Sequence, residues 1–414
     1  MMSARAGMLA PENLALVGRT GALVEVDAAT DRAYADPAGA ALSAPASELS
    51  REVYCLQGIP VDAVDMGEVV QRIKAAAEAK SPFLISTPNV NFLIGSRHDE
   101  HFRESLLRSD LCPADGMPLV WIAKLTGVPI RTRVAGSDIF EELKAAPDPA
   151  RGLKLYLFGG GEGAAAAAAN ALNAKSCGLS CVGKMNPGFG SVDTMSTSEI
   201  IDEINASDAD FLAVSLGAAK GQAWLLQNHD RLRVPVRAHL GATVNFLGGK
   251  VRRAPSWMRA CGLEWLWRLK EEPQLWKRYA KDGAELLGLM VLHVLPLAIL
   301  TRLRSLRSER RGLAIETERR DGDLTLRLSG AATETHVKQA ISSFVHVVTS
   351  NPRTVTIDVS KVRTVDARFL GLLLVLWKLL RVQDVPLQMT GASRRLRTLF
   401  RLQGVGYLLS RQGA

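Results

Sequence analysis

Polar residues that could take part in chemistry are concentrated in residues 87–138, where they follow apolar segments. A strand-like run leads into Thr87 and Asn89, and Asp115 stands in a Pro-rich loop between two helix-like segments. Arg133 comes after the second of these helices. Because α/β proteins place functional groups at the ends of apolar elements, this stretch predicts a site.

A second candidate is the glycine-rich segment 159–163, which joins the strand-like run 153–158 to an alanine-rich helix, 164–174. Backbone N–H groups at a helix N-terminus point outward, and the helix dipole favours anions. The loop could therefore cradle a nucleotide diphosphate, and a plain tight turn is the alternative. It lacks the Gly-Lys-Ser/Thr of a P-loop, and no well-placed acidic residue follows the next strand, as a dinucleotide site requires.

The segments that would position these groups alternate between strands and helices. Strands are expected at residues 83–86, 153–158, 181–184, 210–216 and 236–240, and helices at 69–79, 164–174 and 199–205. Repeated strand, small-residue turn and helix predict a parallel α/β sheet. The length of 414 residues predicts two or three domains.

The net charge of +9 suggests an anionic partner, such as nucleic acid, anionic lipid or a phosphorylated ligand. Residues 256–311 hold eleven Lys or Arg against six Asp or Glu, and an apolar run lies among them. That combination favours a membrane surface. The aromatic and basic interleaving of an RNA-binding sheet is not visible, so nucleic acid is not expected as a partner.

The cysteines and the N-terminal segment predict a reducing, cytoplasmic context. The five cysteines are too scattered for a disulfide framework. Cys177 and Cys181 form a C-x3-C pair without a partner pair, so we do not expect a zinc site. Residues 1–50 are rich in Ala, Gly, Pro, Ser and Asp, which predicts a disordered extension without the apolar segment of a secretory signal.

Residues 256–311 combine tryptophan and arginine with an apolar run. Four of the seven tryptophans fall here, and Trp with Arg suits a membrane interface, although packing of a helical hairpin on the first domain is the alternative. Residues 286–300 are nearly all apolar but are interrupted by His293 and Pro296. Roughly 20 apolar residues are needed to span a bilayer. We therefore expect an in-plane or re-entrant anchor rather than a full span, with a buried interdomain helix as the other alternative.

The last hundred residues form a separate unit. Strands are expected at 315–318, 324–328, 355–359 and 386–389, and helices at 334–348, 370–380 and 393–402. This pattern predicts a small mixed sheet with helices on one side.

Several short motifs occur in order between Val53 and Asp282. They are Thr87-Pro88-Asn89, Pro113-Ala114-Asp115-Gly116, Arg133-x2-Gly136-x-Asp138, Phe158-Gly159-Gly160, Gly249-x3-Arg253-Ala254-Pro255, Gly262-Leu263-Glu264-Trp265-x2-Arg268-x3-Glu272-Pro273 and Arg278-Tyr279. Together they resemble the WecG/TagA/CpsF family of glycosyltransferases, and the last two match the tail that this family carries after its core.

The resemblance implies a Rossmann-like core that transfers a sugar with inversion from a nucleotide diphosphate donor, usually UDP-linked. The implied acceptor is a sugar on a polyprenyl diphosphate lipid at the cytoplasmic face of the membrane. Such a reaction would serve exopolysaccharide or cell-surface polysaccharide synthesis. Neither a metal nor another cofactor is expected.

Individual residues take roles from the same resemblance. Asp115 matches the proposed general base, Thr87 and Asn89 match residues that line the pocket, and Arg133 matches a positive group suited to a diphosphate. The remaining residues expected to bind substrate are Gly136, Gly159, Gly160, Gln222 and Asn245. A turn role is the alternative for Asp115, because Asp-Gly is a common turn pair.

Asp138 and Arg131 lie near these residues in the sequence and are expected to have other roles. Asp138 is expected to cap the helix that follows it, and Arg131 could equally lie on the solvated surface. The chain departs from the family at Gly217-Ala218-Ala219-Lys220-Gly221-Gln222, where many members read Gly-x-Pro-Lys-Gln-Glu. The glutamine is displaced by one position, so the register of Gln222 relative to the family is open. The donor sugar is also open, since mannosamine donors fit one branch of the family and glucosyl donors fit another.

The C-terminal unit resembles a STAS domain, the fold of anti-sigma factor antagonists. The matching segments are Val355-Thr356-Ile357-Asp358-Val359-Ser360, Thr364-Val365-Asp366, Leu370-Gly371-Leu372-Leu373 and Leu387-x2-Thr390-Gly391. Phosphoswitch members carry a serine two positions after the Asp, whereas Asp366 is followed by Ala367 and Arg368. A docking or regulatory module, with a protein partner, is expected rather than a phosphoswitch.

The chain is therefore expected to comprise an extension (1–50), a transferase core (51–255), a membrane-associating appendage (256–311) and a STAS-like domain (312–414). The principal alternative is a regulatory protein whose transferase core has lost activity and which acts through its STAS-like domain. A nicotinamide-dependent oxidoreductase would rest on residues 159–163 alone.

Overall fold

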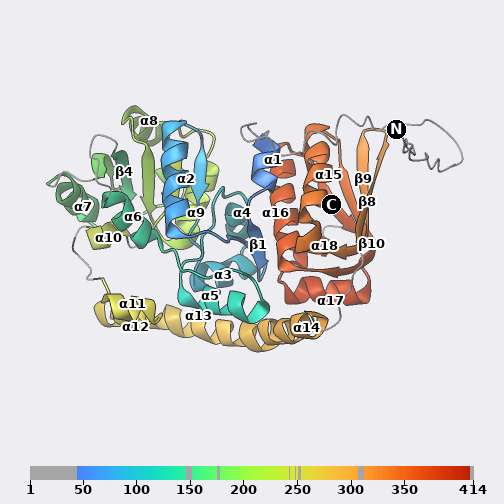
Figure 1. The fold of residues 1–414 in the computed structure, drawn as a ribbon. Coiled ribbons are helices and arrows are strands. Elements are labelled where there is room, and N and C mark those ends of the chain that lie inside the picture. Colours follow the sequence, from blue (N-terminus) through green and yellow to red (C-terminus); the bar gives the residue numbers. More distant parts are fainter. Residues whose placement is uncertain are drawn as a thin grey trace, which may run out of the picture. The chain divides into compact units, whose positions relative to one another are not determined.

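A five-stranded parallel sheet forms the centre of the core, in the order β3-β7-β6-β4-β5 (Figure 1). Its strands are β3 (Phe83–Ile85), β4 (Leu153–Gly159), β5 (Leu179–Met185), β6 (Phe211–Ser215) and β7 (Val236–His239). Strands β6 and β7 are buried throughout, as is typical of a parallel sheet covered on both faces. The predicted parallel α/β sheet is confirmed, and all five carboxyl ends lie at one edge.

The computed structural model describes residues 44–145, 152–174, 178–241, 243–247, 249, 253–305 and 312–410.

Helices cover both faces of this sheet. Alternate residues of β4 enter different hydrophobic clusters: Leu155 and Leu157 pack with α2, α6 and α7, whereas Tyr156 and Phe158 pack with α8 and α9. The core helices are α2 (Met66–Glu78), α3 (Val90–His98), α4 (Glu100–Leu107), α5 (Met117–Thr126), α6 (Gly136–Lys144), α7 (Ala164–Asn173), α8 (Ser198–Ala206), α9 (Ala218–Gln227) and α10 (Thr243–Leu247).

The appendage is a run of helices that ends in one long helix. It contains α11 (Ser256–Ala260), α12 (Glu264–Glu271), α13 (Trp276–Leu289), the π-helical segment η5 (Met290–Val294) and α14 (Leu295–Ser305). Pro296 has no N–H to donate to the preceding turn, and a wider π turn is one way in which a helix accommodates this loss. The chain therefore continues through Pro296 as helix.

One side of the long helix is apolar and exposed. Leu287, Val291, Leu295, Ile299 and Leu303 recur every four residues and are 44–66% exposed. The opposite side is buried and packs along the core. The helix spanning 273–303 is long and apolar enough to cross a membrane by length and composition.

The C-terminal domain has a four-stranded mixed sheet in the order β11-β10-β9-β8, which confirms the predicted small mixed sheet. Strand β10 pairs in parallel with β9 and β11, and β8 pairs antiparallel with β9. The elements are β8 (Leu313–Arg320), β9 (Asp323–Ala332), α15 (Val337–Thr349), β10 (Val355–Val365), α16 (Ala367–Val382), β11 (Leu387–Thr390), α17 (Arg394–Leu402) and α18 (Tyr407–Ser410).

An N-terminal hairpin of the core joins this domain to the rest of the chain. Strands β1 (Val53–Leu56) and β2 (Ile59–Asp62) are fully buried. Their turn residues, Gln57 and Gly58, have φ angles of 51° and 97°, which suit a two-residue hairpin turn. Helix α16 packs against β1 so closely that a Cβ on Gly371 would lie 2.1 Å from the Val53 carbonyl oxygen.

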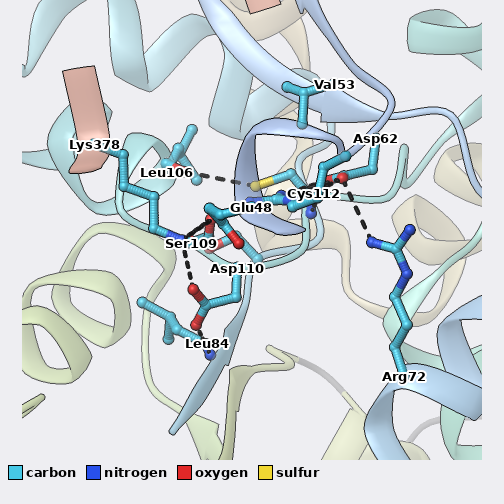
Figure 2. A network of polar contacts seen from close by, with 12 residues as sticks. Glu48, Val53, Asp62, Arg72, Leu84, Leu106, Ser109, Asp110, Cys112 and Lys378 are labelled. Carbon is cyan, nitrogen blue, oxygen red and sulfur yellow. Dashed lines mark hydrogen bonds and ion pairs between the residues drawn. The ribbon is translucent and has the colours of Figure 1, made fainter. Parts of the chain in front are cut away.

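Buried charges fix the same junction (Figure 2). The Lys378 ammonium of α16 lies 2.7 Å from Glu48 Oε1 and 2.5 Å from Asp110 Oδ1. Arg51 pairs with Asp62 at 2.9 Å and also contacts Glu48. Burial alone would raise the pKa of Glu48, but the charges of Arg51 and Lys378 lower it below its ordinary value. Both domains therefore depend on one desolvated ionic network.

The predicted extension requires a correction at its end. Residues 1–43 lie outside the described residues, but α1 (Ala44–Leu49) is a helix that buries Ala46 and Leu49 against the C-terminal domain. Its partner Lys378 stands 330 residues later in the chain. Local composition could not reveal this packing, because the stabilising surface comes from a distant segment.

Candidate active site

A cavity of about 490 Å³ opens at the carboxyl edge of the core sheet. Thr87 after β3 and His239 at the end of β7 line one part of it, and Asp115 and Gly136 line another. The appendage closes the remaining side, with Tyr279 of α13 among the lining residues. The structure thus brings together the ends of the two neighbouring strands β3 and β7 and the appendage that follows β7 in the chain.

The turn after β3 holds the two predicted pocket residues in place. Thr87 is buried and lines the cavity. Asn89 also lines it, and its side-chain oxygen accepts a hydrogen bond from the Phe92 N–H at 3.3 Å, so Asn89 is the N-cap of α3. The Asp115 N–H donates to the Pro88 carbonyl at 2.8 Å. This bond ties the Asp115 loop directly to the Thr87–Asn89 turn.

Asp115 is a carboxyl group with a perturbed pKa. Burial raises its pKa to about 7, the positive charge of Arg133 opposes that rise, and the charges of Glu264 and Asp138 add to it. A backbone hydrogen bond from Gly136 favours the ionised form. A carboxyl group that titrates near neutral pH is matched to general-base work.

Arginines and carboxylates form a network beside Asp115. Arg133 pairs with Asp138 at 2.6 Å and with Glu264 at 2.8 Å. Asp138 also pairs with Arg253 and, at 3.0 Å, with Arg259. The expectation that Asp138 caps its helix is wrong: Ala135 occupies the N-cap of α6, and the Asp138 carboxylate is engaged by three arginines instead.

The arginines retain unused hydrogen-bond donors. Within the described part of the chain, the Nε atoms of Arg253, Arg259 and Arg268 are buried and make no hydrogen bond. Arg259 and Arg268 line the cavity. Buried donors are normally satisfied, and guanidinium groups bind phosphate oxygens well. The guanidinium groups of Arg259 and Arg268 therefore make this wall of the cavity suited to an anionic ligand.

The glycines and the remaining predicted residues have different positions. Gly136 lines the cavity, and a Cβ there would lie 2.6 Å from the Leu240 side chain. Gly159 and Gly160 lie at the same sheet edge but do not line the cavity; the Gly160 N–H donates to the Ser215 carbonyl at 2.7 Å. Asn245 belongs to α10, and its side chain lies outside the described residues.

Gln222 is likewise not a lining residue. It is fully buried in α9 and its Nε2 donates to Ser86 Oγ at 3.0 Å. The departure from the family pattern in residues 217–222 therefore leaves the described cavity wall unchanged. Of the predicted substrate residues, the cavity brings together Thr87, Asn89, Arg133 and Gly136 with Asp115.

Sequence reasoning missed the appendage as a cavity wall. Glu264, Trp265, Tyr279 and Asp282 all line the cavity, and Asp282 accepts a hydrogen bond from Asn91 at 3.1 Å. Because this aromatic and basic segment was interpreted as a membrane contact, its role as a wall of the cavity was not predicted. A usable signal was the spacing of Glu264 and Arg268, because residues four apart share one face of a helix.

His239 was also missed. Its Nε2 lies 2.7 Å from the Leu216 carbonyl oxygen, so Nε2 must carry the proton. Burial lowers the pKa of His239, which keeps the ring neutral. A Cβ on Gly221 would lie 2.1 Å from the ring, so this glycine makes room for the histidine. The ring presents its other nitrogen as an acceptor.

The fold and site define a class: an α/β protein with a buried carboxyl group and several arginines lining a cavity at the carboxyl edge of its sheet. Residues 54–298 match the glycosyl transferase WecG/TagA/CpsF family, and residues 315–410 match the family described as Mlab, STAS domain. The first match covers more than half of the chain, which therefore belongs to the WecG/TagA/CpsF glycosyltransferases and carries a C-terminal STAS domain.

Similar proteins include two curated relatives, each described as an N-acetylglucosaminyldiphosphoundecaprenol N-acetyl-beta-D-mannosaminyltransferase. The Bacillus subtilis (strain 168) protein is 25% identical over 195 residues, which are 47% of this chain and 74% of the relative. The Bacillus spizizenii protein is 26% identical over 200 residues, 48% of this chain and 75% of the relative. A solved structure of the phosphorylated Bacillus cell fate determinant SpoIIAA is 18% identical, covers 23% of this chain and 88% of that chain, and has a TM-score of 0.21.

Proposed function

We propose that this glycosyltransferase moves an N-acetylmannosaminyl group from a UDP-linked donor to N-acetylglucosaminyl-diphosphoundecaprenol or a closely similar lipid-linked sugar. The relatives supply the sugar and the acceptor, since their names state both. The observation that carries the proposal is Asp115, whose carboxyl faces the arginine-lined cavity with a pKa of about 7. The product would enter cell-surface or extracellular polysaccharide synthesis.

The proposed reaction is a single displacement with inversion. Asp115 takes the proton from the acceptor hydroxyl as its oxygen bonds to the anomeric carbon of the donor sugar. The bond between that carbon and the diphosphate oxygen breaks, and UDP leaves with the electron pair. Thr87 and Asn89 would contact the sugar at the cavity wall.

The leaving diphosphate needs positive charge and hydrogen-bond donors. Arg133, Arg259 and Arg268 line the cavity and would supply them. The Gly159–Gly160 turn lies at the same sheet edge, but the Gly160 N–H is already bonded to the Ser215 carbonyl, so we assign no diphosphate contact to it. Because arginines supply the charge, we propose a reaction that needs no metal and is undiminished by a chelator.

The pH profile tests the assigned base. Asp115 must be ionised to accept a proton, so kcat/KM should rise with pH through the pKa of about 7 and then level off. Measured rates of UDP release from pH 5 to 9 at saturating acceptor and limiting donor would show this limb. A profile that is flat between pH 5.5 and 8 would contradict the assignment.

We also propose that the enzyme acts at the cytoplasmic membrane surface. Its acceptor would be embedded in lipid, and the exposed stripe along 287–303 is about 24 Å long. An amphipathic helix of this kind lies in the interface with its apolar side among the acyl chains. The same helix lines the cavity through Tyr279 and Leu286, so membrane binding would bring the lipid-linked sugar to the site.

Replacing Val291 and Leu295 by aspartate tests this placement, since both side chains are exposed on the apolar stripe. Vesicle co-sedimentation of the double variant should fall at least tenfold relative to the wild type, whereas the fold stays intact by circular dichroism. Val382→Asp, at an equally exposed position of the C-terminal domain, is the matched control and should sediment normally. Equal sedimentation of all three proteins would reject the stripe as the anchor.

A further inference from the structure

Helix α17 of the C-terminal domain has a strongly basic outer face. Leu396, Leu399 and Phe400 are buried in the domain, whereas the side chains on its other faces are exposed. The exposed basic residues are Arg394, Arg395, Arg397 and Arg401. The helix contains no Asp or Glu, and no ion pair within the described part of the chain involves these four arginines. Their charges are therefore available to an external anion.

This basic face borders the apolar stripe of the appendage. His293 Nδ1 lies 3.1 Å from the Arg401 carbonyl oxygen, and Leu300 of α14 packs on the core of the C-terminal domain. Figure 1 shows α17 directly beside α14, on the side of the domain where the appendage runs. Because α17 follows β11 and the sheet strands β9, β10 and β11 are parallel, this face lies at their carboxyl ends.

We propose that α17 binds the headgroups of anionic phospholipids, which makes the C-terminal domain a second membrane contact of the enzyme. An apolar helix buried just below the headgroups, with arginines beside it at headgroup level, is the arrangement expected of an interfacial surface. Arginine stems cover apolar surface while the guanidinium stays among the phosphates. The inference rests on the membrane association proposed above.

Two separate contacts would do more than strengthen binding. The long helix alone would let the protein rock about the helix axis within the width of the apolar stripe, whereas a second contact on α17 limits that motion. The buried junction of α16 with Val53 and Asp110 makes the two domains move together. The C-terminal domain would thereby fix the direction in which the cavity faces the membrane.

The test uses the full chain with vesicles of phosphatidylcholine alone or mixed with phosphatidylglycerol. Each arginine near an anionic surface contributes about a fivefold increase in partition coefficient. The triple variant Arg394→Glu, Arg395→Glu, Arg401→Glu should therefore lose roughly 100-fold or more of its binding to the anionic vesicles. Its binding to neutral vesicles should stay unchanged, and a triple lysine variant should retain wild-type binding.

A matched control carries the same change of charge elsewhere in the domain. Arg319, Arg320 and Arg353 are exposed near the β8–β9 turn, at the opposite end of the sheet from α17. Their triple glutamate variant should bind anionic vesicles within a few-fold of the wild type. An equal loss in both triple variants, or no loss in the α17 variant, would overturn the inference.

Two further outcomes separate this inference from its foundation. If the wild type binds neither type of vesicle, the membrane association itself fails. If the wild type binds both equally well and the α17 variant behaves identically, only the role of α17 fails. If the full chain bound a single-stranded oligonucleotide more tightly than anionic vesicles at the same salt concentration, and the α17 variant lost that binding, the arginines would be assigned to nucleic acid and the lipid rejected.

Discussion

Replacing Asp115 by asparagine should lower kcat by a factor of at least about 10²–10⁴, the contribution typical of a positioned general base. Asparagine keeps the shape of the side chain but cannot accept the acceptor hydroxyl proton. The effect should appear in acceptor-dependent release of UDP, followed under saturating conditions. Donor affinity should change little, because Arg133, Arg259 and Arg268 remain in the cavity wall.

The stability of the same variant supplies a control. The pKa of Asp115 in the folded chain is raised to about 7, so the folded state binds its proton more tightly than the unfolded state. The contribution of this group to stability is therefore largest below its ordinary pKa and is lost as the pH rises through about 7. At pH 8 the asparagine variant should be at least as stable as the wild type, so a loss of turnover could not be attributed to unfolding.

Turnover by the asparagine variant at the wild-type rate would show that another group is the base.

Replacing Lys378 by methionine should destabilise the protein by about 3–5 kcal/mol, the cost of removing one partner of a buried ion pair. The Lys378 side chain is 8% exposed, and methionine would leave Glu48 and Asp110 without their shared cation. Urea unfolding followed by circular dichroism measures the effect. A second readout is protease cleavage near the α1 segment, which should become faster when the junction loosens.

The control for this change is Lys361→Met, at an exposed position of β10, which should shift stability by no more than about 0.5 kcal/mol. The pH dependence is a further check. The lowered pKa of Glu48 gives stability that is present above its ordinary value of 4.5 and is lost as the pH falls through the folded value. The difference between wild type and Lys378→Met should therefore narrow under acid conditions. A difference below 1 kcal/mol at pH 7 would contradict the role assigned to the network.

Local sequence patterns predicted those strands and helices whose residues show a regular apolar pattern along the chain. Buried apolar runs such as Leu153–Gly159 read as strands because parallel strands are covered on both faces. The helix predicted at 370–380 is present but begins earlier, at Ala367, where the Asp366 side chain accepts a hydrogen bond from the Phe369 N–H. Thr87, Asn89 and Asp115 were predicted to lie near one another because loops at strand ends carry functional groups, and the cavity does bring them together; the role of Asp115 as the base stays a prediction.

Other parts depend on partners that are distant in sequence. The β1–β2 hairpin is stabilised by α16, more than 300 residues later, and Tyr54 donates a hydrogen bond to Glu334 at 3.0 Å. The appendage was interpreted through its aromatic residues, although Glu264 and Asp282 face the cavity. The partners of Asp138 are arginines up to 121 residues away, which no capping rule could have identified.

The alternative of a transferase core without activity drew on the unusual residues 217–222. The structure places Gln222 away from the cavity wall, hydrogen bonded to Ser86, so the departure removes no cavity contact of the described residues. The C-terminal domain, in turn, uses the start of α16 to hold the core: Arg368 donates to the Val53 carbonyl at 3.1 Å. This contact favours a domain that supports the transferase rather than one that replaces its function.

The most direct measurement is the mass spectrum of the lipid product after incubation with UDP-N-acetylmannosamine and N-acetylglucosaminyl-diphosphoundecaprenol. The wild type should convert the acceptor into a species larger by one N-acetylhexosamine, with release of one UDP for each sugar transferred, and Asp115→Asn should leave the acceptor unchanged. If the wild type gives no such species with this donor or with other UDP-sugars, or if Asp115→Asn forms it at the wild-type rate, the proposed transfer or its base is wrong.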